Sequence, residues 1–494
     1  MSQAEIRRLA AQSVSPRRLF INGKHVAAAD EATLDVISPI DGRVFSSIAR
    51  ASAADAGQAV GAARKSFESG VWSRASPAER KKVMHRIADL VEKHALELAV
   101  LGVRDNGTEI SMALKAEPGS AAATFRYYAE SIDKVYGEIA PTPSSILALI
   151  HRDPVGVVAV IVPWNFPMMI GSWKIAPALA AGNSVVLKPA EAASLSLLRL
   201  AELCAEAGLP DGVLNVVTGK GGQCGEALGL HMDVDVMAFT GSGFVGRKLM
   251  EYSARSNMKR CYLELGGKSP NVVFGDAPDL DQAARISAYG IFRNSGQVCV
   301  AGSRLLVEAS IHDEFVNRVT AIASKMKVGD PLDLTTEAGA VTSEDQLQKD
   351  LEFVRSAAAD GGRLETGGKR ILQETGGFYM APTVFSGIKP EMHLAQEEVF
   401  GPVLAVMKFK DEADAVRIAN STVYGLAAAV WTSNLSKAHR MVRNIRAGVV
   451  HVNTYGGSDN TVPLGGVGQS GNGHDKSLHA LDKYLDLKTA WIQL

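Results

Sequence analysis

Short apolar runs alternate with amphipathic stretches through the middle of this chain, and this alternation limits the fold more than any other feature. Four such runs occupy residues 155–162, 184–188, 213–217 and 234–239. Runs that are apolar throughout are typical of strands buried on both faces of a sheet. Between them, residues 195–207 have the spacing of a helix that ends at Gly208. The alternation therefore predicts βαβ units and an open parallel sheet.

A second set of strands is predicted downstream, at residues 271–274, 305–311, 403–409, 427–431 and 449–452. The chain has 494 residues, which is too long for a single hydrophobic core. We therefore expect an α/β protein with two open-sheet units of similar style. A capping box from Ser76 to Glu79 predicts the start of a helix before the first unit.

Composition argues against several classes of protein. The net charge of −1 gives no reason to expect binding to nucleic acid or an anionic membrane, and no apolar run approaches the ~20 residues that span a bilayer. Four scattered cysteines are too few for a disulfide framework and suggest a reducing compartment, so we expect a cytoplasmic protein. No His-x-x-x-His or Cys-x-x-Cys pair occurs, so a metal site is not expected.

Cys299 and Glu264 are the two residues that most directly suggest a reaction. Both lie close to glycines, which let the backbone approach a ligand closely. A lone cysteine is more often a small core hydrophobe, but the polar neighbours Asn294 and Ser295 would make a poor core segment. A thiol at 299 could attack a carbonyl, and a carboxylate at a strand end could activate water.

Two glycine-rich segments allow other hypotheses. Gly267-Lys268-Ser269 resembles the end of a phosphate-binding loop, but the first glycine of that motif would fall at Tyr262. Residues 241–246 satisfy Gly-x-Gly-x-x-Gly. In dinucleotide-binding proteins, this motif is followed ~20 positions later by an acidic residue that binds ribose, and that position falls near Glu264. From the residues alone, Glu264 is therefore either a base for water or a ribose ligand.

Three further polar residues have both a structural and a functional interpretation. Asn165, between Pro163 and Pro167, is either a turn residue or an amide donor to an oxyanion, a role worth roughly 3–4 kcal/mol. Lys188 and Glu191 follow a buried strand, and they either begin a helix or hold ribose hydroxyls.

Six segments, taken in order, make the chain resemble the NAD(P)-dependent aldehyde dehydrogenase superfamily over nearly its whole length. They are residues 163–167, 188–191, 239–242, 264–268, 296–299 and 398–402. The resemblance implies that Cys299 attacks an aldehyde, that Asn165 and the Cys299 N–H hold the oxyanion, and that hydride transfer leaves a thioester. It also implies that Glu264 activates the water that hydrolyses this thioester, in preference to binding ribose.

The same resemblance implies NAD as the cofactor. Lys188 and Glu191 would bind the adenine ribose, and Glu191 would repel a 2′-phosphate, so NAD should be preferred over NADP. Ser242 would contact the pyrophosphate, Glu398 the nicotinamide ribose and Phe400 the nicotinamide. Trp164, Gly221 and Gly225 complete the implied cofactor site.

A domain organisation and an assembly are implied as well. Residues 1–127 and 153–263 would form the NAD-binding domain, and residues 264–466 the catalytic domain. Residues 128–152 and 467–494 would form a small β element through which subunits associate as a homotetramer or homodimer, since unpaired strand edges invite pairing.

The implied substrate site combines apolar residues with one arginine. Phe166, Met169, Ile170 and Trp173 would line an apolar tunnel, and Leu464 stands where a phenylalanine is common in relatives. Arg293 replaces a residue that is often aromatic. It is either a solvated or structurally paired arginine, or it clasps a carboxylate as in semialdehyde dehydrogenases, although Trp173 is unlike those enzymes.

The substrate and the type of reaction leave further alternatives. Residues 127–138 and 475–491 most resemble the branch of the family that oxidises γ-glutamyl-aminobutyraldehyde and related aminoaldehydes. The alternative to this substrate class is a broad-specificity aliphatic or aromatic aldehyde dehydrogenase. A cofactor-independent thiol acyltransferase or hydrolase would leave Lys188, Glu191 and Glu398 without a role. A transfer to coenzyme A would not need Glu264, and a non-catalytic protein would need none of the reacting residues.

Overall fold

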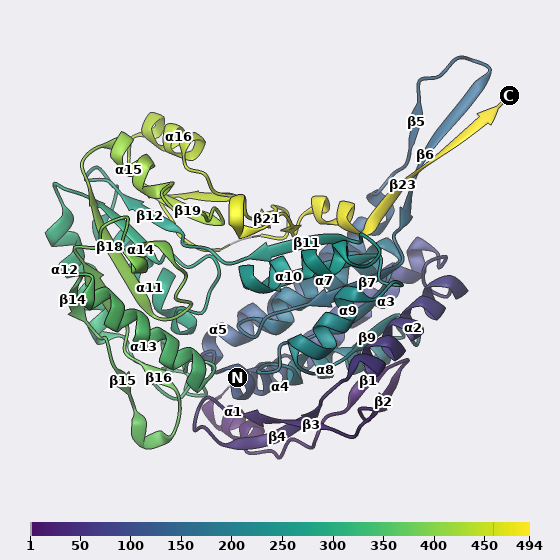
Figure 1. Ribbon diagram of the computed structural model, residues 1–494, viewed down its shortest axis with the longest axis horizontal. Helices are drawn as coiled ribbons and strands as arrows, with labels where there is room; N and C mark the ends of the chain where they lie inside the picture. The colour runs from purple at the N-terminus through teal and green to yellow at the C-terminus, as the bar shows by residue number, and fades with distance from the viewer. Residues whose placement is uncertain (1, 458) are drawn as a thin grey trace.

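The computed structural model describes residues 2–457 and 459–494. Two seven-stranded sheets with helices packed against them form the body, and a three-stranded sheet projects from it (Figure 1). The predicted α/β architecture with two open, mainly parallel sheets is confirmed. Among the described residues, no helix is both long and apolar enough to cross a membrane.

The first sheet has the strand order β11-β10-β7-β8-β9-β1-β2. Its five parallel strands are β7 (Val157–Ile161), β8 (Ser184–Lys188), β9 (Leu214–Val216), β10 (Val236–Gly241) and β11 (Arg260–Leu265). The first four were predicted from their apolar runs. The edge strands β1 (Leu19–Ile21) and β2 (Lys24–Val26) are antiparallel and were not predicted, because three residues are too few to show a periodic pattern.

Helices cover both faces of this sheet and bury its strands. The principal ones are α2 (Ala53–Ser69), α3 (Pro77–Lys93), α4 (Ala95–Asn106), α6 (Ser120–Ser131), α7 (Pro167–Ala181), α8 (Leu195–Glu206) and α10 (Gly243–Ala254). The predicted capping box is present at α3, where Ser76 and Glu79 each accept a hydrogen bond from the other's backbone N–H. Almost all of α7 is buried, so the helix that follows Asn165 is anchored in the core.

The second sheet has the order β14-β17-β18-β13-β12-β19-β20. Its strands are β12 (Pro270–Val273), β13 (Arg304–Glu308), β14 (Arg363–Thr366), β17 (Thr383–Ser386), β18 (Val403–Phe409), β19 (Ala427–Trp431) and β20 (Val449–Val452). Only β14 is antiparallel to its neighbour, and β14 and β17 are the two strands that were not predicted. The main helices are α11 (Leu280–Phe292), α12 (His312–Lys325), α13 (Glu344–Ala359), α15 (Glu412–Ala419) and α16 (Leu435–Asn444).

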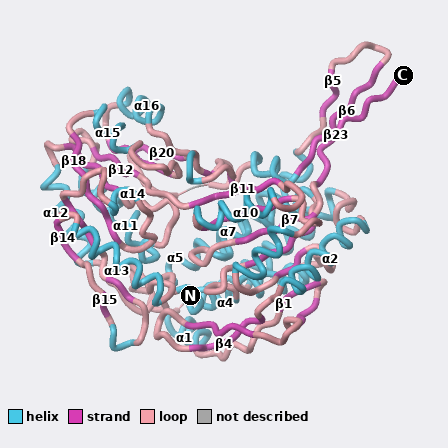
Figure 2. Tube along the Cα trace, in the orientation of Figure 1, coloured by secondary structure: helices cyan, strands magenta, loops and turns pink. Residues whose placement is uncertain are grey.

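The third sheet has the order β23-β6-β5 and extends away from both larger sheets (Figures 1 and 2). It consists of β5 (Glu138–Ala140), β6 (Ile146–Pro154) and β23 (Leu485–Gln493). Tyr128, the start of the expected β element, lies within α6 instead and is buried, with its hydroxyl donating to the Ser477 carbonyl at 3.0 Å. The expected domain boundaries as a whole stay a prediction.

The carboxyl ends of the first sheet carry most of the polar residues singled out from the sequence. Lys188 ends β8, Glu264 is the penultimate residue of β11, and Ser242 follows β10 directly. Because parallel strands end at one edge of a sheet, these residues are brought to the same side, where open α/β sheets bind their ligands.

Buried Arg304 ties this edge to the second sheet. Its guanidinium donates to the carbonyls of Lys268 (2.7 Å), Ile418 (3.0 Å) and Ala419 (2.7 Å), and the last two belong to the final turn of α15. Carbonyls in the last turn of a helix have no partner within the helix, so one planar side chain satisfies acceptors from two segments.

We expect Arg304→Met to lower the free energy of unfolding by ~3 kcal/mol, because the buried carbonyls of Lys268 and Ala419 lose this donor, whereas the Ile418 carbonyl keeps the hydroxyl of Ser421. Arg417→Met is the matched control: Arg417 lies on α15, the helix whose last carbonyls Arg304 binds, but its side chain is exposed, and its loss should cost within about 0.5 kcal/mol. Denaturant unfolding of the two variants tests this, and equal losses would contradict the assigned role of Arg304.

Candidate active site

The segment from Asn294 to Cys299, here called the cysteine loop, follows α11 in an unusual conformation. Asn294, Ser295 and Gly296 have φ values of 49°, 50° and 73°. Two consecutive non-glycine residues in the left-handed region are uncommon and cost of order 1–3 kcal/mol each, so surrounding contacts must hold them.

Those contacts come from segments far away in the sequence. The Thr108 hydroxyl donates to the Asn294 side chain at 2.8 Å, and the Ser295 hydroxyl donates to the Gly339 carbonyl at 2.8 Å. Gln297 accepts from the Thr342 N–H at 2.8 Å. The expectation that polar Asn294 and Ser295 make a poor core segment is therefore wrong: both are buried, because each polar group has a partner.

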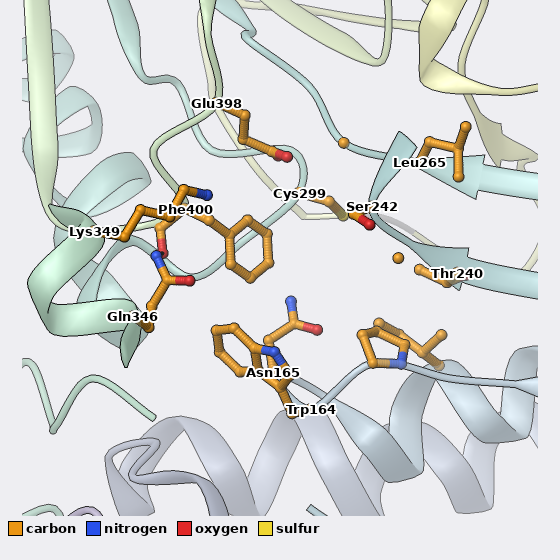
Figure 3. A pocket seen from close by; sticks show the side chains of 14 residues that line it. Trp164, Asn165, Thr240, Ser242, Leu265, Cys299, Gln346, Lys349, Glu398 and Phe400 are labelled. Atoms are coloured by element: carbon orange, nitrogen blue, oxygen red, sulfur yellow. Dashed lines mark hydrogen bonds between the residues drawn. The ribbon is translucent and has the colours of Figure 1, made fainter. Parts of the chain in front are cut away.

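Asn165 lies between β7 and α7 and touches the cysteine loop. Its Nδ2 donates to the Gln297 carbonyl at 2.9 Å, and the Asn106 side chain donates to the Asn165 carbonyl at 3.3 Å. The amide nitrogen carries two hydrogens, so one donor remains after the bond to Gln297. Figure 3 shows this amide and Cys299 facing the same cavity.

The Cys299 thiol is half-buried and lies near two acidic residues. Burial, followed by the negative charges of Glu264 and Glu398, raises the pKa of the thiol well above its usual value. At neutral pH the thiol is therefore protonated, and it must lose this proton to act as a nucleophile.

Glu264 is buried at the end of β11. Burial raises its pKa to about 7; the charge of Lys174 opposes this rise and that of Asp475 adds to it. Asp475 lies between two buried lysines, 2.6 Å from Lys174 Nζ and 2.5 Å from Lys483 Nζ. This charge cluster was not predicted, since isolated lysines and aspartates are usually surface residues.

A cavity of about 170 Å³ lies beside Cys299 (Figure 3). Of the predicted site residues, Trp164, Asn165, Ile170, Ser242, Cys299, Glu398 and Phe400 line it. Gln346 and Lys349 of α13 also line it and were not predicted, because polar residues on a charged helix look like a solvated face.

The cavity wall carries groups that fit a nicotinamide nucleotide. Glu398 accepts from the Gly267 N–H at 3.0 Å and offers its remaining lone pairs to ribose hydroxyls. Trp164 and Phe400 meet edge to face with ring centroids 5.2 Å apart, which forms an apolar boundary. Ser242 caps the N-terminus of α10, where backbone N–H groups favour a pyrophosphate.

The residues expected at the adenine ribose are also brought together. Glu191 accepts from the Gly221 N–H at 2.8 Å and lies 3.7 Å from Lys188 Nζ, while Gly225 packs against the Lys188 side chain. Glu191 is partly exposed, so its carboxylate remains accessible to a ligand. The preference for NAD over NADP stays a prediction.

The expected substrate residues divide into two groups. Phe166, Ile170, Trp173 and Leu464 are buried in one hydrophobic cluster, and Met169 packs against it. Arg293 is exposed and lies apart, with its guanidinium carbon 5.0 Å from the centroid of the Tyr289 ring.

Comparison with known proteins agrees with this geometry. Residues 25–490 match the aldehyde dehydrogenase family. The NADP/NAD-dependent aldehyde dehydrogenase PuuC of Escherichia coli is 51% identical over 477 residues, which cover 97% of this chain and 96% of that protein.

Two solved structures superpose on the whole chain with a TM-score of 0.98, and each match covers 100% of both chains. One is a γ-glutamyl-γ-aminobutyraldehyde dehydrogenase from Burkholderia cenocepacia, 50% identical, and the other is an indole-3-acetaldehyde dehydrogenase in complex with NAD⁺, 52% identical. The chain belongs to the aldehyde dehydrogenase family and is an NAD-dependent aldehyde dehydrogenase.

Proposed function

We propose that this enzyme oxidises its aldehyde to a carboxylic acid through a thioester on Cys299. The observation that carries the proposal is the cavity shared by Cys299, Asn165, Glu398 and Phe400, which combines a nucleophile, an oxyanion donor and nucleotide-binding groups. The net reaction converts aldehyde, NAD⁺ and water into acid, NADH and a proton.

The first step is the attack of the Cys299 sulfur on the aldehyde carbon. The thiol loses its proton, a carbon–sulfur bond forms, and the carbonyl oxygen becomes an oxyanion. The remaining N–H of Asn165 Nδ2 and the Cys299 N–H donate to that oxygen. The bond from Asn165 to Gln297 supports this role, because it holds the amide in one orientation.

Hydride departure from the same carbon then leaves the thioester. Trp164, Glu398 and Phe400 would hold and orient NAD, which would supply the hydride acceptor. Glu264 next takes a proton from the water that attacks the thioester, releasing the acid and restoring the thiol. A pKa of about 7 suits a base at neutral pH, and this supports water activation over ribose binding for Glu264.

Two alternative reactions, cofactor-independent acyl transfer or hydrolysis and transfer of the acyl group to coenzyme A, can be distinguished from the proposed reaction by their products. Ester turnover without NAD and without aldehyde oxidation would favour the acyltransferase or hydrolase. Acyl-CoA as the product in the presence of coenzyme A would favour acyl transfer, in which Glu264 has no role. The buried Glu264 close to Cys299 supports hydrolysis by water instead.

For the substrate, we propose an aminoaldehyde that carries a charged end remote from the aldehyde, such as a γ-glutamyl-aminobutyraldehyde. The solved Burkholderia relative is named for such a substrate, and Arg293 provides a guanidinium that an apolar aldehyde would not need. A broad-specificity aliphatic or aromatic aldehyde dehydrogenase is the alternative.

We also propose that the subunits associate as a homotetramer or homodimer through the third sheet, and that the enzyme works in the cytoplasm. Edge strand β23 exposes Leu487 and Trp491, which supports pairing with another subunit. All four cysteines are free thiols, which supports a reducing compartment.

Cys299→Ala should abolish the rise in NADH absorbance on addition of aldehyde, lowering kcat by at least about 10³-fold, because Cys299 is the only thiol among the residues described as lining the cavity. Cys261→Ala removes a thiol outside the cavity and is the matched control. An unchanged rate in Cys299→Ala would refute the covalent mechanism.

Glu264→Gln should still give a rapid burst of one NADH per active site, followed by turnover about 10²–10⁴-fold slower than wild type, because only thioester hydrolysis needs the base. In wild type, the hydrolysis rate should fall as the pH drops below about 7, since protonation removes the base; this limb should vanish in the variant. Stopped-flow and pH–rate measurements check both points. Loss of the burst itself would assign Glu264 to an earlier step.

Combining Leu487→Arg with Trp491→Arg should reduce the particle mass measured by light scattering, because the new charges would be buried between subunits. Leu435→Arg, at an exposed leucine of α16, is the control. A wild-type enzyme that is monomeric at micromolar concentration would disprove the proposed assembly.

A further inference from the structure

Residues 106–109, here called the α4–α5 segment, connect the end of α4 to the short helix α5 (Ile110–Leu114). Three of the four residues, Asn106, Thr108 and Glu109, have polar side chains, and all three are buried. A buried polar group is costly unless it is hydrogen-bonded. The partners of these three side chains therefore indicate what the segment holds in place.

The first two side chains connect the proposed oxyanion donor to the cysteine loop. Asn106 donates to the Asn165 carbonyl at 3.3 Å and accepts from the Thr108 N–H at 3.0 Å. The Thr108 hydroxyl donates to the Asn294 side chain at 2.8 Å, and Asn294 donates to the same Asn165 carbonyl at 3.4 Å. A closed ring of hydrogen bonds thus joins Asn165 to the loop that ends at Cys299, and Figure 3 shows both of these side chains at one cavity.

Glu109 holds the backbone of the same loop. The Asn294 N–H donates to both oxygens of the Glu109 carboxylate, at 3.2 and 3.4 Å. The backbone N–H of Gly339 also stabilises this carboxylate, and the Ser295 hydroxyl donates to the Gly339 carbonyl at 2.8 Å. Because Asn294 and Ser295 have left-handed φ values that cost of order 1–3 kcal/mol each, contacts of this kind are needed to keep the loop in its observed form.

We propose that Glu109 is a positioning residue, whose carboxylate fixes the backbone at Asn294 and thereby the position of Cys299 relative to Asn165. The inference rests on the proposed function, because it assumes that the Cys299 sulfur attacks the aldehyde and that Asn165 stabilises the oxyanion. Glu109 lines a different cavity from Cys299, so it acts through the loop and does not touch the aldehyde. A displacement of ~1 Å in a reacting group can lower the rate about 10²-fold.

The ionised carboxylate is the better acceptor for this role. Hydrogen bonds to a charged acceptor are roughly twice as strong as neutral ones, and protonation would turn one Glu109 oxygen into a donor that faces the Asn294 N–H. Burial raises the pKa of Glu109 to about 7, while its backbone N–H donors and then the charge of Arg293 oppose the rise. The hold on the cysteine loop should therefore weaken as the pH falls through about 7.

The other ionisable groups beside Glu109 keep their charge near neutral pH. The side chains concerned line a cavity of about 480 Å³ and are Arg285, Tyr289, Arg293, Glu337 and Tyr455. Arginines stay positively charged in proteins. The hydrogen bond to Glu337 raises the pKa of Tyr289, burial raises that of Tyr455, and the Lys327 N–H and the Tyr289 hydroxyl lower that of Glu337. Among the residues described as lining this cavity, Glu109 is thus the group that changes charge near pH 7.

The test compares Glu109→Gln and Glu109→Ala with wild type by kcat/KM for propanal, a neutral aldehyde, at saturating NAD. This parameter covers attack and hydride transfer, which precede the hydrolysis step. Each value is divided by the number of NAD-binding sites, measured by titration with NAD, so that unfolded protein does not count as lost activity. At pH 8.5 the per-site kcat/KM should fall about tenfold in Glu109→Gln, which keeps one acceptor oxygen, and about 10²-fold in Glu109→Ala, which keeps none.

The pH profile separates this role from a purely structural one. The ratio of per-site kcat/KM in wild type over Glu109→Gln cancels the titration of Cys299, and it should fall from about ten at pH 8.5 to within about twofold below pH 6. The same ratio measured in an Arg293→Met background should change at a higher pH, because loss of the positive charge raises the pKa of Glu109.

Glu337→Gln is the matched control, because it neutralises a carboxylate of the same cavity that is bonded to Tyr289 and Lys327. It should leave the per-site kcat/KM for propanal unchanged at every pH. An equal loss in this control, or per-site values within twofold of wild type in both Glu109 variants, would overturn the positioning role. A wild-type to Glu109→Gln ratio that stays near ten below pH 6 would overturn it as well. Oxidation of propanal by Cys299→Ala would instead overturn the proposed function.

Discussion

The backbone of the cysteine loop passes directly against the backbone of Gly401, and this contact depends on the missing side chain of Gly296. A Cβ atom at 296 would lie 2.1 Å from the Gly401 carbonyl oxygen, and the φ of 73° adds a second reason for glycine. Gly401 in turn packs on Asp350 of α13, where a Cβ atom would lie 2.3 Å from the carboxylate. Two glycines thus let three chain segments approach: the cysteine loop, residues 398–401 and helix α13. These segments supply Cys299, Glu398, Phe400, Gln346 and Lys349, so the same close packing sets the position of the nucleophile and of the nucleotide-binding groups.

The charges around Cys299 are interdependent because they share a buried region. Glu264 and Glu398 both have a pKa of about 7, raised mainly by burial, and both raise the pKa of the thiol. Like charges this close disfavour one another, so ionisation of one group makes ionisation of the next more costly. Lys174 counters part of this negative charge, while Asp475 is held by both Lys174 and Lys483. The protonated thiol is thus a consequence of the same burial that keeps the pKa of the proposed base near 7.

Much of the fold could be predicted from the sequence because parallel strands buried on both faces are apolar along their whole length. All four runs expected in the first sheet and all five in the second occur as strands, with ends shifted by a few residues. The edge hairpin of β1 and β2 and the short strands β14 and β17 lack such runs, and their pairing depends on distant partners. Asn294 and Ser295 were misjudged for the same reason: nothing near them in the sequence shows that Thr108 and Gly339 will satisfy their polar groups. Gln346 and Lys349 could not be found because their function depends on how α13 packs, and its own pattern shows only a charged helix.

The choice of aldehyde must depend on features other than the fold and the cysteine loop. Two structures that match this chain with the same TM-score of 0.98 are named for very different substrates, one with an indole ring and one with a γ-glutamyl group. Fold similarity at that level therefore does not determine the substrate. The apolar cluster of Phe166, Ile170 and Trp173 is buried. Apolar contact area of this kind discriminates only weakly between ligands of similar size. Charged groups that must be paired discriminate much more strongly, because a ligand lacking the complementary group leaves them desolvated and alone. Arg293, directly before the cysteine loop, is the charged group on which the proposed preference for a charged substrate end depends.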